Sequence, residues 1–250
     1  MCGRGYAGWR GELMAGLQVI EIFDSLQGEG FWTGVPMTFV RLAGCNAPEL
    51  GLGCVRWCDT PDSWAPESGA EMEPAEILDR AHFPRVCLTG GEPLLQTEGI
   101  VALVAEARYR GIKVHLETNG TVEPPAAAAR PGPPGEPQAG ADTLFDWAVV
   151  SPKPPDYLIA QGWDGLIDEL KLVADERLEA ATAERLAARH PGAIVCIQPV
   201  WERGPGPEGR RPPEGRRPPG GSSEARAVRL VMEHPEWRLS LQTHKYLGNR

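Results

Sequence analysis

The sequence predicts an α/β fold in which a mostly parallel sheet carries its helices on the outside. Short segments rich in β-branched and apolar residues alternate along the chain with helix-forming segments, as they do in repeated strand–helix units. The 250 residues, of which 42% are hydrophobic, are enough for one sizeable core. We therefore expect a single folded domain over residues 18–250.

Six segments are predicted to be strands, because β-branched and other apolar side chains dominate them. They cover residues 19–23, 37–44, 85–90, 112–118, 147–151 and 194–200.

Two helices are predicted between these strands, over residues 97–110 and 175–190. The first has Thr97 as a candidate N-cap and Gly111 directly after its last turn, where glycine commonly ends a helix. The second repeats this design, starting at Asp175 and ending before Pro191. Both helices suit the outer layer of an α/β fold.

Three segments fall outside the strand–helix pattern. Residues 1–17 are expected to form an N-terminal tail, in which Met14 is a candidate native start. Residues 124–141 are almost entirely Pro, Ala and Gly, and residues 202–223 contain PEGRRP twice in succession. Neither of these two segments can bury enough apolar surface to offset the entropy of ordering, so both are predicted to be disordered insertions.

Composition limits the partners of this chain. A formal net charge of -9 and a pI near 5.2 provide no general attraction to nucleic acid or to an anionic membrane. No apolar run approaches the roughly 20 residues that span a bilayer, and the N-terminus lacks the apolar stretch of a secretory signal. We therefore expect a cytoplasmic protein that acts on a small molecule.

Cysteine spacing is the first indication of chemistry. Six cysteines are too few for a disulfide scaffold, but Cys45, Cys54 and Cys58 lie within fourteen residues. Three thiolates on a 4Fe-4S cluster leave one iron open for S-adenosylmethionine, which the reduced cluster cleaves to a 5′-deoxyadenosyl radical. A Cys3His zinc site with His82 is the alternative, and spacing alone does not separate the two.

The other cysteines have a simpler interpretation. Cys87 and Cys196 each lie inside an apolar strand and are predicted to be small buried hydrophobic residues.

A glycine-rich turn follows the strand predicted at 85–90. The TGGEP run at 89–93 has glycines that allow close approach of the backbone to a ligand, at the strand edge where parallel α/β folds usually bind one. Its amides could meet the methionine end of the cofactor. Alone the motif is weak, because any strand-to-helix turn can use glycine and proline.

Eight motifs taken in order resemble the radical S-adenosylmethionine family of 7-carboxy-7-deazaguanine synthases, the ring-contracting enzymes of 7-deazapurine (queuosine-type) biosynthesis. The resemblance covers nearly all of residues 18–250 outside the two insertions, and it implies a partial, shortened β/α TIM-like barrel with the motif loops at one end. The motifs are EIFDSLQGEG (21–30), GVPMTFVRLAGCN (34–46), WCDT (57–60), TGGEPLLQ (89–96), ETNGT (117–121), SPK (151–153), ELKLV (169–173) and LSLQTHKYLG (239–248).

The resemblance also implies the cofactor sites. The 4Fe-4S cluster is expected on Cys45, Cys54 and Cys58, and Thr60 is expected to ligate Mg²⁺, a hard cation that prefers oxygen. The S-adenosylmethionine site is expected at Trp57, Cys58, Asp59, Gly91, Ser151, Pro152, Lys153, Gln198, Pro199, Val200 and Trp201.

The substrate implied by the resemblance is a carboxylated tetrahydropterin, and no side chain beyond the cluster and the cofactor radical is assigned to catalysis. The guanidinium of Arg41 can grip the substrate carboxylate, and the Gln27 amide can pair with the pterin edge. Two alternatives stay open: Arg41 can instead pair with a surface acid, and His244 and Lys245 can be framework residues of a last strand. The expected substrate residues are Leu26, Gln27, Gly28, Arg41, Thr89 and the terminal Arg250.

One spacing departs from the family pattern. Three residues separate Cys54 from Cys58, where the family has two. Because Cys45 and the WCDT motif align firmly, Cys54 is the displaced ligand, and a loop can absorb the extra residue.

The implied reaction abstracts hydrogen from C6 of the substrate, contracts its six-membered ring and releases ammonia. The family also implies a homodimer and an electron donor such as flavodoxin or ferredoxin. Two other classes fit the residues alone: a radical enzyme that activates a partner protein, and a non-catalytic zinc or iron-sulfur module.

Overall fold

The computed structural model describes residues 16–126, 144–201 and 222–248. The expected tail therefore lies outside the described residues up to position 15, and the two expected insertions lie outside them at 127–141 and 202–221. Two expected boundaries need correction. Leu17 is a buried residue of the first strand, and Ser222 and Ser223 cap and begin a helix rather than end an insertion.

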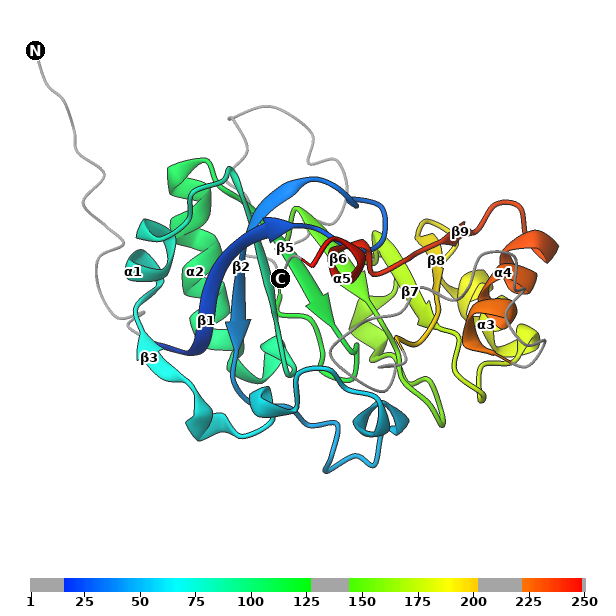
Figure 1. Ribbon diagram of the computed structural model, residues 1–250. Coiled ribbons are helices and arrows are strands. Elements are labelled where there is room, and N and C mark those ends of the chain that lie inside the picture. Colours follow the sequence, from blue (N-terminus) through cyan, green and yellow to red (C-terminus); the bar gives the residue numbers. More distant parts are fainter. Residues whose placement is uncertain (1–15, 127–143, 202–221, 249–250) are drawn as a thin grey trace, which may run out of the picture.

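A nine-stranded open sheet forms the centre of the described structure (Figure 1). Its order is β3-β1-β2-β4-β5-β6-β7-β8-β9; β1 pairs antiparallel with β2 and β3, whereas the neighbours from β2 to β9 are parallel. The strands are β1 (Leu17–Leu26), β2 (Pro36–Leu42), β3 (Ala70–Met72), β4 (Arg85–Gly90), β5 (Lys113–Thr118), β6 (Trp147–Val150), β7 (Glu169–Val173), β8 (Ile194–Gln198) and β9 (Arg238–Leu239).

Helices cover the outer face of the sheet, α1 and α2 beside its first half and α3 and α4 beside its second half (Figure 1). Their bounds are α1 Pro74–Asp79, α2 Thr97–Arg110, α3 Ala180–Arg189, α4 Ser223–Glu233 and α5 Thr243–Leu247. No helix of the described ranges is long and apolar enough to cross a membrane.

The two predicted helices exist, with corrections at their starts. Helix α2 ends at the left-handed Gly111 (φ +72°), as predicted, but Gln96 and not Thr97 is its N-cap. Helix α3 begins at Ala180 rather than Asp175, because the Asp175 carboxylate accepts a hydrogen bond from the Arg177 amide and holds a turn there.

Side chains alternate across the sheet, and this alternation separates the core from the site. The outward residues pack with the helices as the main hydrophobic core: Val40, Leu42, Val86, Leu88, Val114, Leu116, Val150, Leu170, Leu172 and Ile197. The inward residues are more polar and line internal cavities: Phe39, Arg41, Cys87, Thr89, His115, Glu117, Val149, Glu169, Lys171, Val173 and Gln198. Cys87 and Cys196 are buried, as predicted.

The C-terminal segment differs from the prediction. His244 and Lys245 lie in the short helix α5 and not in a last strand, because the Thr243 amide and hydroxyl both donate to the Gly28 carbonyl and turn the chain over the barrel end.

Candidate active site

A cavity of about 260 Å³ opens at the carboxyl ends of the parallel strands. Most of the predicted site residues line it: Leu26, Gln27, Gly28, Arg41, Cys45, Cys54, Trp57, Cys58, Asp59, Thr60, Thr89, Gly91, Ser151, Lys153 and Gln198. The described residues Pro152, Pro199, Val200 and Trp201 do not line it, and Arg250 lies outside the described residues.

The cysteine loop enters the cavity directly after β2. Gly44 adopts a left-handed conformation (φ +91°), and the Cys45 amide donates to the Trp64 carbonyl at 3.1 Å. Burial raises the pKa of the Cys45 thiol to about 11, and the neighbouring Cys54 and Cys58 act in the same direction. Because metal binding requires thiolates, a bound cation would offset this cost, so the three thiols suit a positively charged iron-sulfur core.

The segment before Cys58, which has one residue more than the family pattern, forms a short 3-10 turn, Gly53–Arg56. The Trp57 amide donates to the Cys54 carbonyl at 3.0 Å, and the Gly53 amide donates to Pro154 at 2.7 Å. In this conformation Cys54 and Cys58 both line the cavity.

His82, the expected fourth ligand of the zinc alternative, does not lie beside the three thiols. His82 Nδ1 lies 2.5 Å from Asp24 Oδ2, and His82 does not line the cavity. Across the described ranges, no three thiol, imidazole or carboxylate groups are grouped so that they could hold one metal ion. A cubane differs in this respect, because its thiolates bind separate irons and need not converge on a point.

The double-glycine turn packs directly on the cysteine loop. A Cβ on Gly91 would overlap the Gly44 carbonyl oxygen and lie 2.7 Å from the Cys45 Cβ. The fully buried Glu92 fixes this turn, since its carboxylate accepts from the Thr118 hydroxyl and the Asn119 amide, each at 2.7 Å. Burial raises the pKa of Glu92, although these donors oppose the shift.

The SPK motif contributes a lysine to the same side of the cavity. Lys153 Nζ donates to the Ser151 hydroxyl at 2.7 Å and lies 5.6 Å from the centre of the Trp57 ring. Burial lowers the pKa of Lys153. Pro152, between these two lining residues in the sequence, is buried.

Arg41 has both of the environments considered for it, the cavity and a pair with an acid. Its side chain lines the cavity, while its Nε donates to Glu21 at 2.8 Å and its guanidinium lies 5.6 Å from the Phe23 ring centre. The pair with Glu21 therefore orients the Arg41 side chain and leaves it in the cavity.

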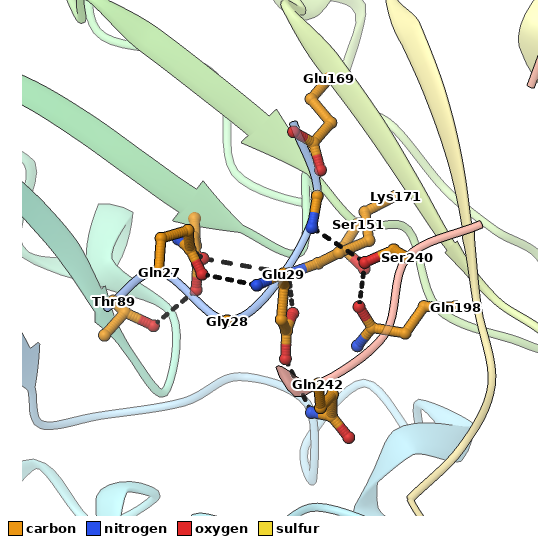
Figure 2. A network of polar contacts seen from close by, with 12 residues as sticks. Gln27, Gly28, Glu29, Thr89, Ser151, Glu169, Lys171, Gln198, Ser240 and Gln242 are labelled. Atoms are coloured by element: carbon orange, nitrogen blue, oxygen red, sulfur yellow. Dashed lines mark hydrogen bonds and ion pairs between the residues drawn. The ribbon is translucent and has the colours of Figure 1, made fainter. Parts of the chain in front are cut away.

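A buried cluster of Glu29, Glu117 and Lys171 contacts Gln27 and Thr89, and we call it the polar floor of the cavity (Figure 2). Its three charged residues were not predicted from the sequence. Lys171 Nζ lies 2.5 Å from Glu29 Oε2 and 4.0 Å from Glu117 Oε1. Glu117 in turn accepts from the Gln27 amide and the Thr89 hydroxyl, each at 3.1 Å. All three charged residues lie inside the quoted motifs, and the two-residue period of β5 and β7 was the signal that could have identified Glu117 and Lys171 as inward side chains.

The charges of the floor stabilise one another. Burial acts to raise the pKa of Glu29, but the Lys171 charge and hydrogen bond outweigh it and hold this pKa at about 2. Burial acts to lower the pKa of Lys171, but Glu117 and Glu29 outweigh it and raise this pKa above its ordinary value. Glu29 and Lys171 are therefore both ionised in this pair.

Helix α5 lies against two loops of the cavity. A Cβ on Gly28 would overlap the His244 ring, so glycine permits this contact. Lys245 Nζ lies 2.5 Å from Asp59 Oδ2 and 5.6 Å from the Trp201 ring centre. Trp201 is thus beside α5, outside the cavity lining.

An unclosed α/β barrel that gathers three cysteine thiols beside a double-glycine turn has the arrangement of radical S-adenosylmethionine enzymes. Two relatives named 7-carboxy-7-deazaguanine synthase align with almost the whole chain. The one from Synechocystis sp. is 31% identical over 237 residues, 93% of both chains, and the one from Nitratidesulfovibrio vulgaris is 33% identical over 250 residues, 92% of this chain and 98% of the other. The chain belongs to the 7-carboxy-7-deazaguanine synthase family.

A solved structure supports the architecture. The crystal structure of QueE from Escherichia coli superposes with a TM-score of 0.62 at 20% identity, covering 90% of this chain and 93% of that one. This likeness confirms the predicted partial barrel. No protein-family model matches the chain.

Proposed function

We propose that this chain is a radical S-adenosylmethionine lyase that converts 6-carboxy-5,6,7,8-tetrahydropterin to 7-carboxy-7-deazaguanine with loss of ammonia, in 7-deazapurine (queuosine-type) biosynthesis. The observation that carries the proposal is the meeting of three motifs in one cavity: the cysteine loop, the double-glycine turn and residues 26–28. Relatives that carry this activity in their names align with more than nine-tenths of the chain.

The cluster would be held by Cys45, Cys54 and Cys58. With S-adenosylmethionine bound, it supplies a 5′-deoxyadenosyl radical. The chain's own part is to orient the cofactor. Gly91 lines the cavity and packs against the cysteine loop, and the space beside the thiols is surrounded by Trp57, Asp59, Ser151, Lys153 and Gln198.

The substrate would lie against residues 26–28 and Thr89. Arg41, oriented by Glu21, presents a guanidinium for the substrate carboxylate, and the Thr60 hydroxyl faces the same cavity as a ligand for Mg²⁺. Holding the ring in one orientation lowers the entropic part of the barrier to hydrogen abstraction at C6.

The segment that contains α5 would keep water from the radical. Gln242 and His244 line the cavity, and the same segment is bonded to Gly28 and Asp59 on either side. The proposal also includes Pro152, Pro199, Val200 and Trp201 as contacts of the cofactor and Arg250 as a contact of the substrate. The electron would come from a flavodoxin or ferredoxin, and the active form would be a homodimer.

An anaerobic assay tests the proposal. The reconstituted protein is mixed with the carboxylated tetrahydropterin, S-adenosylmethionine, dithionite and Mg²⁺, and the deazapurine product is measured by mass spectrometry. Cys58→Ala should abolish the product and reduce the iron content, whereas Cys196→Ala, a buried cysteine outside the cavity, should change neither. Cleavage of S-adenosylmethionine without any deazapurine would contradict the substrate, and full iron content in Cys58→Ala would contradict the cluster site.

A further inference from the structure

Lys171 is a buried cation in β7, a strand whose outward side chains lie in the hydrophobic core. It lies on the inner face of β7, its side chain is 9% exposed, and both of its neighbours, Leu170 and Leu172, are fully buried in the hydrophobic core. Replacing a buried ion pair by apolar residues is often neutral or stabilising, so packing alone does not call for a lysine here. Its charge must therefore be explained by what it contacts.

The contacts of Lys171 lead into the substrate end of the cavity. Its ammonium group pairs with Glu29, whose other carboxylate oxygen accepts from Gln242 at 2.7 Å. Its second carboxylate neighbour, Glu117, holds the Gln27 amide and the Thr89 hydroxyl. Figure 2 shows Lys171 and Glu29 meeting between these groups.

The same network fixes the backbone of the loop after β1. The Glu29 amide donates to the Gln27 side chain at 3.0 Å, and the Gly30 amide donates to the Ser240 hydroxyl at 2.9 Å. Removal of the lysine would leave the Glu29 carboxylate buried without a cation. Such a group becomes neutral, and a protonated carboxyl is itself a donor and no longer an acceptor only.

We propose that Lys171 is a positioning residue for substrate binding, whose ammonium group keeps Glu29 as an ionised acceptor and, through Glu117, holds Gln27 and Thr89 in place. This inference rests on the proposed function. Lys171 acts through the two carboxylates and does not itself react.

Other titratable groups face the pair from the elements around it, and they too can contribute to the pH dependence of binding. The charged or titratable groups are Glu117 on β5, Lys153 after β6, Glu169 on β7 and His244 on α5, and burial keeps the Cys87 and Cys196 thiols on β4 and β8 neutral. With Lys171 present, the pKa of Glu29 is far below neutral, so its charge is constant from pH 6 to 9. Without Lys171, burial raises the pKa of Glu29, and its charge returns only as the pH rises.

The test is equilibrium binding of 6-carboxypterin, the stable oxidised relative of the substrate, from pH 6 to 9. The affinity of each variant is compared with that of the wild type at the same pH, which cancels the titration of the ligand. Lys171→Met should bind about ten-fold more weakly at pH 6, the effect of roughly one pKa unit, and should approach the wild type at pH 9. Lys171→Arg, which keeps a cation, should stay within about three-fold of the wild type at every pH.

Two further variants keep the test decisive. Glu29→Gln mimics the neutral carboxyl and should bind weakly at every pH, and it carries the test if Lys171→Met does not fold. Lys113→Met, at an exposed lysine paired with Asp146, is the matched control and should bind as the wild type does. Iron content and substrate-free cleavage of S-adenosylmethionine should equal those of the wild type in Lys113→Met, which lies outside the cavity.

The outcomes separate the inference from the function on which it rests. A loss of affinity in Lys171→Met that is equal at all pH values, or wild-type affinity in Lys171→Met or Glu29→Gln, overturns the positioning role alone. A wild-type protein that does not bind 6-carboxypterin overturns the proposed function, and the positioning role falls with it.

Discussion

Gly91 and Cys45 are in such close contact that a single added carbon on the glycine would lie 2.7 Å from the Cys45 Cβ and overlap the carbonyl oxygen of Gly44. The turn after β4 and the loop after β2 are therefore packed backbone to backbone. Glu92 strengthens this contact, since its amide donates to Gly44 at 2.8 Å. The turn that would meet the cofactor and the first cysteine thus form one rigid unit.

Gly91→Ala should separate these two loops. Relief of the overlap requires a backbone shift, which typically costs about 1–3 kcal/mol of unfolding free energy. We expect lower iron content after reconstitution and at least roughly ten-fold weaker binding of S-adenosylmethionine, the effect of about 1.4 kcal/mol. Gly192→Ala is the control, because a Cβ there would meet nothing within 4 Å. Normal iron content and cofactor binding in Gly91→Ala would show that the contact is not required.

Arg41→Lys tests the assignment of the substrate carboxylate. A lysine keeps the positive charge but loses the planar fork that binds a carboxylate through two hydrogen bonds, worth about 2 kcal/mol or roughly 30-fold. We expect KM for the substrate to rise by this factor with a smaller change in kcat. Arg110→Lys, at an arginine on α2 that pairs with Glu106 and Asp79, should leave both constants unchanged. An unchanged KM in Arg41→Lys would favour a purely structural pair with Glu21.

Much of this site follows from local sequence, and the rest depends on long-range pairing. The spacing of Cys45, Cys54 and Cys58 and the glycines beside them are local signals, and the structure brings all three thiols to one cavity. The Glu29–Lys171 pair joins residues 142 positions apart, and it exists only because the loop after β1 crosses the inner face of β7. No local pattern specifies that crossing.

Helix α5 is a second case of tertiary control. Five residues are too few for a stable isolated helix, so propensity could not predict it. Contacts with Gly28 and Asp59 determine its place, and both partners are far away in the sequence. By contrast, α2 and the strands β1, β2, β4, β5, β6 and β8 were predicted, because their apolar patterns are regular and Gly111 ends the helix.

Lys245→Met should loosen α5 from the cysteine loop without unfolding the protein. The Lys245–Asp59 pair is half exposed on the aspartate side, and such pairs contribute about 0–1 kcal/mol to stability. We expect a melting temperature close to that of the wild type, but weaker binding of S-adenosylmethionine, because Asp59 loses its partner beside the cofactor. Asp59→Asn should reproduce the effect. Equal cofactor affinity in both variants and the wild type would place the pair outside the functional site.

His115 should make stability depend on pH. Its side chain is buried against Trp32, and burial, aided by the charge of Arg85, lowers its pKa from 6.5 to about 4. Between these values the unfolded chain binds the proton and the folded chain does not, so stability falls as the pH falls from 6.5 to 4, by about 3 kcal/mol from this group. His115→Phe keeps a ring but cannot titrate, so its unfolding free energy, measured with urea at several pH values, should decline less over this range. An identical decline in the variant and the wild type would assign the pH dependence to other groups.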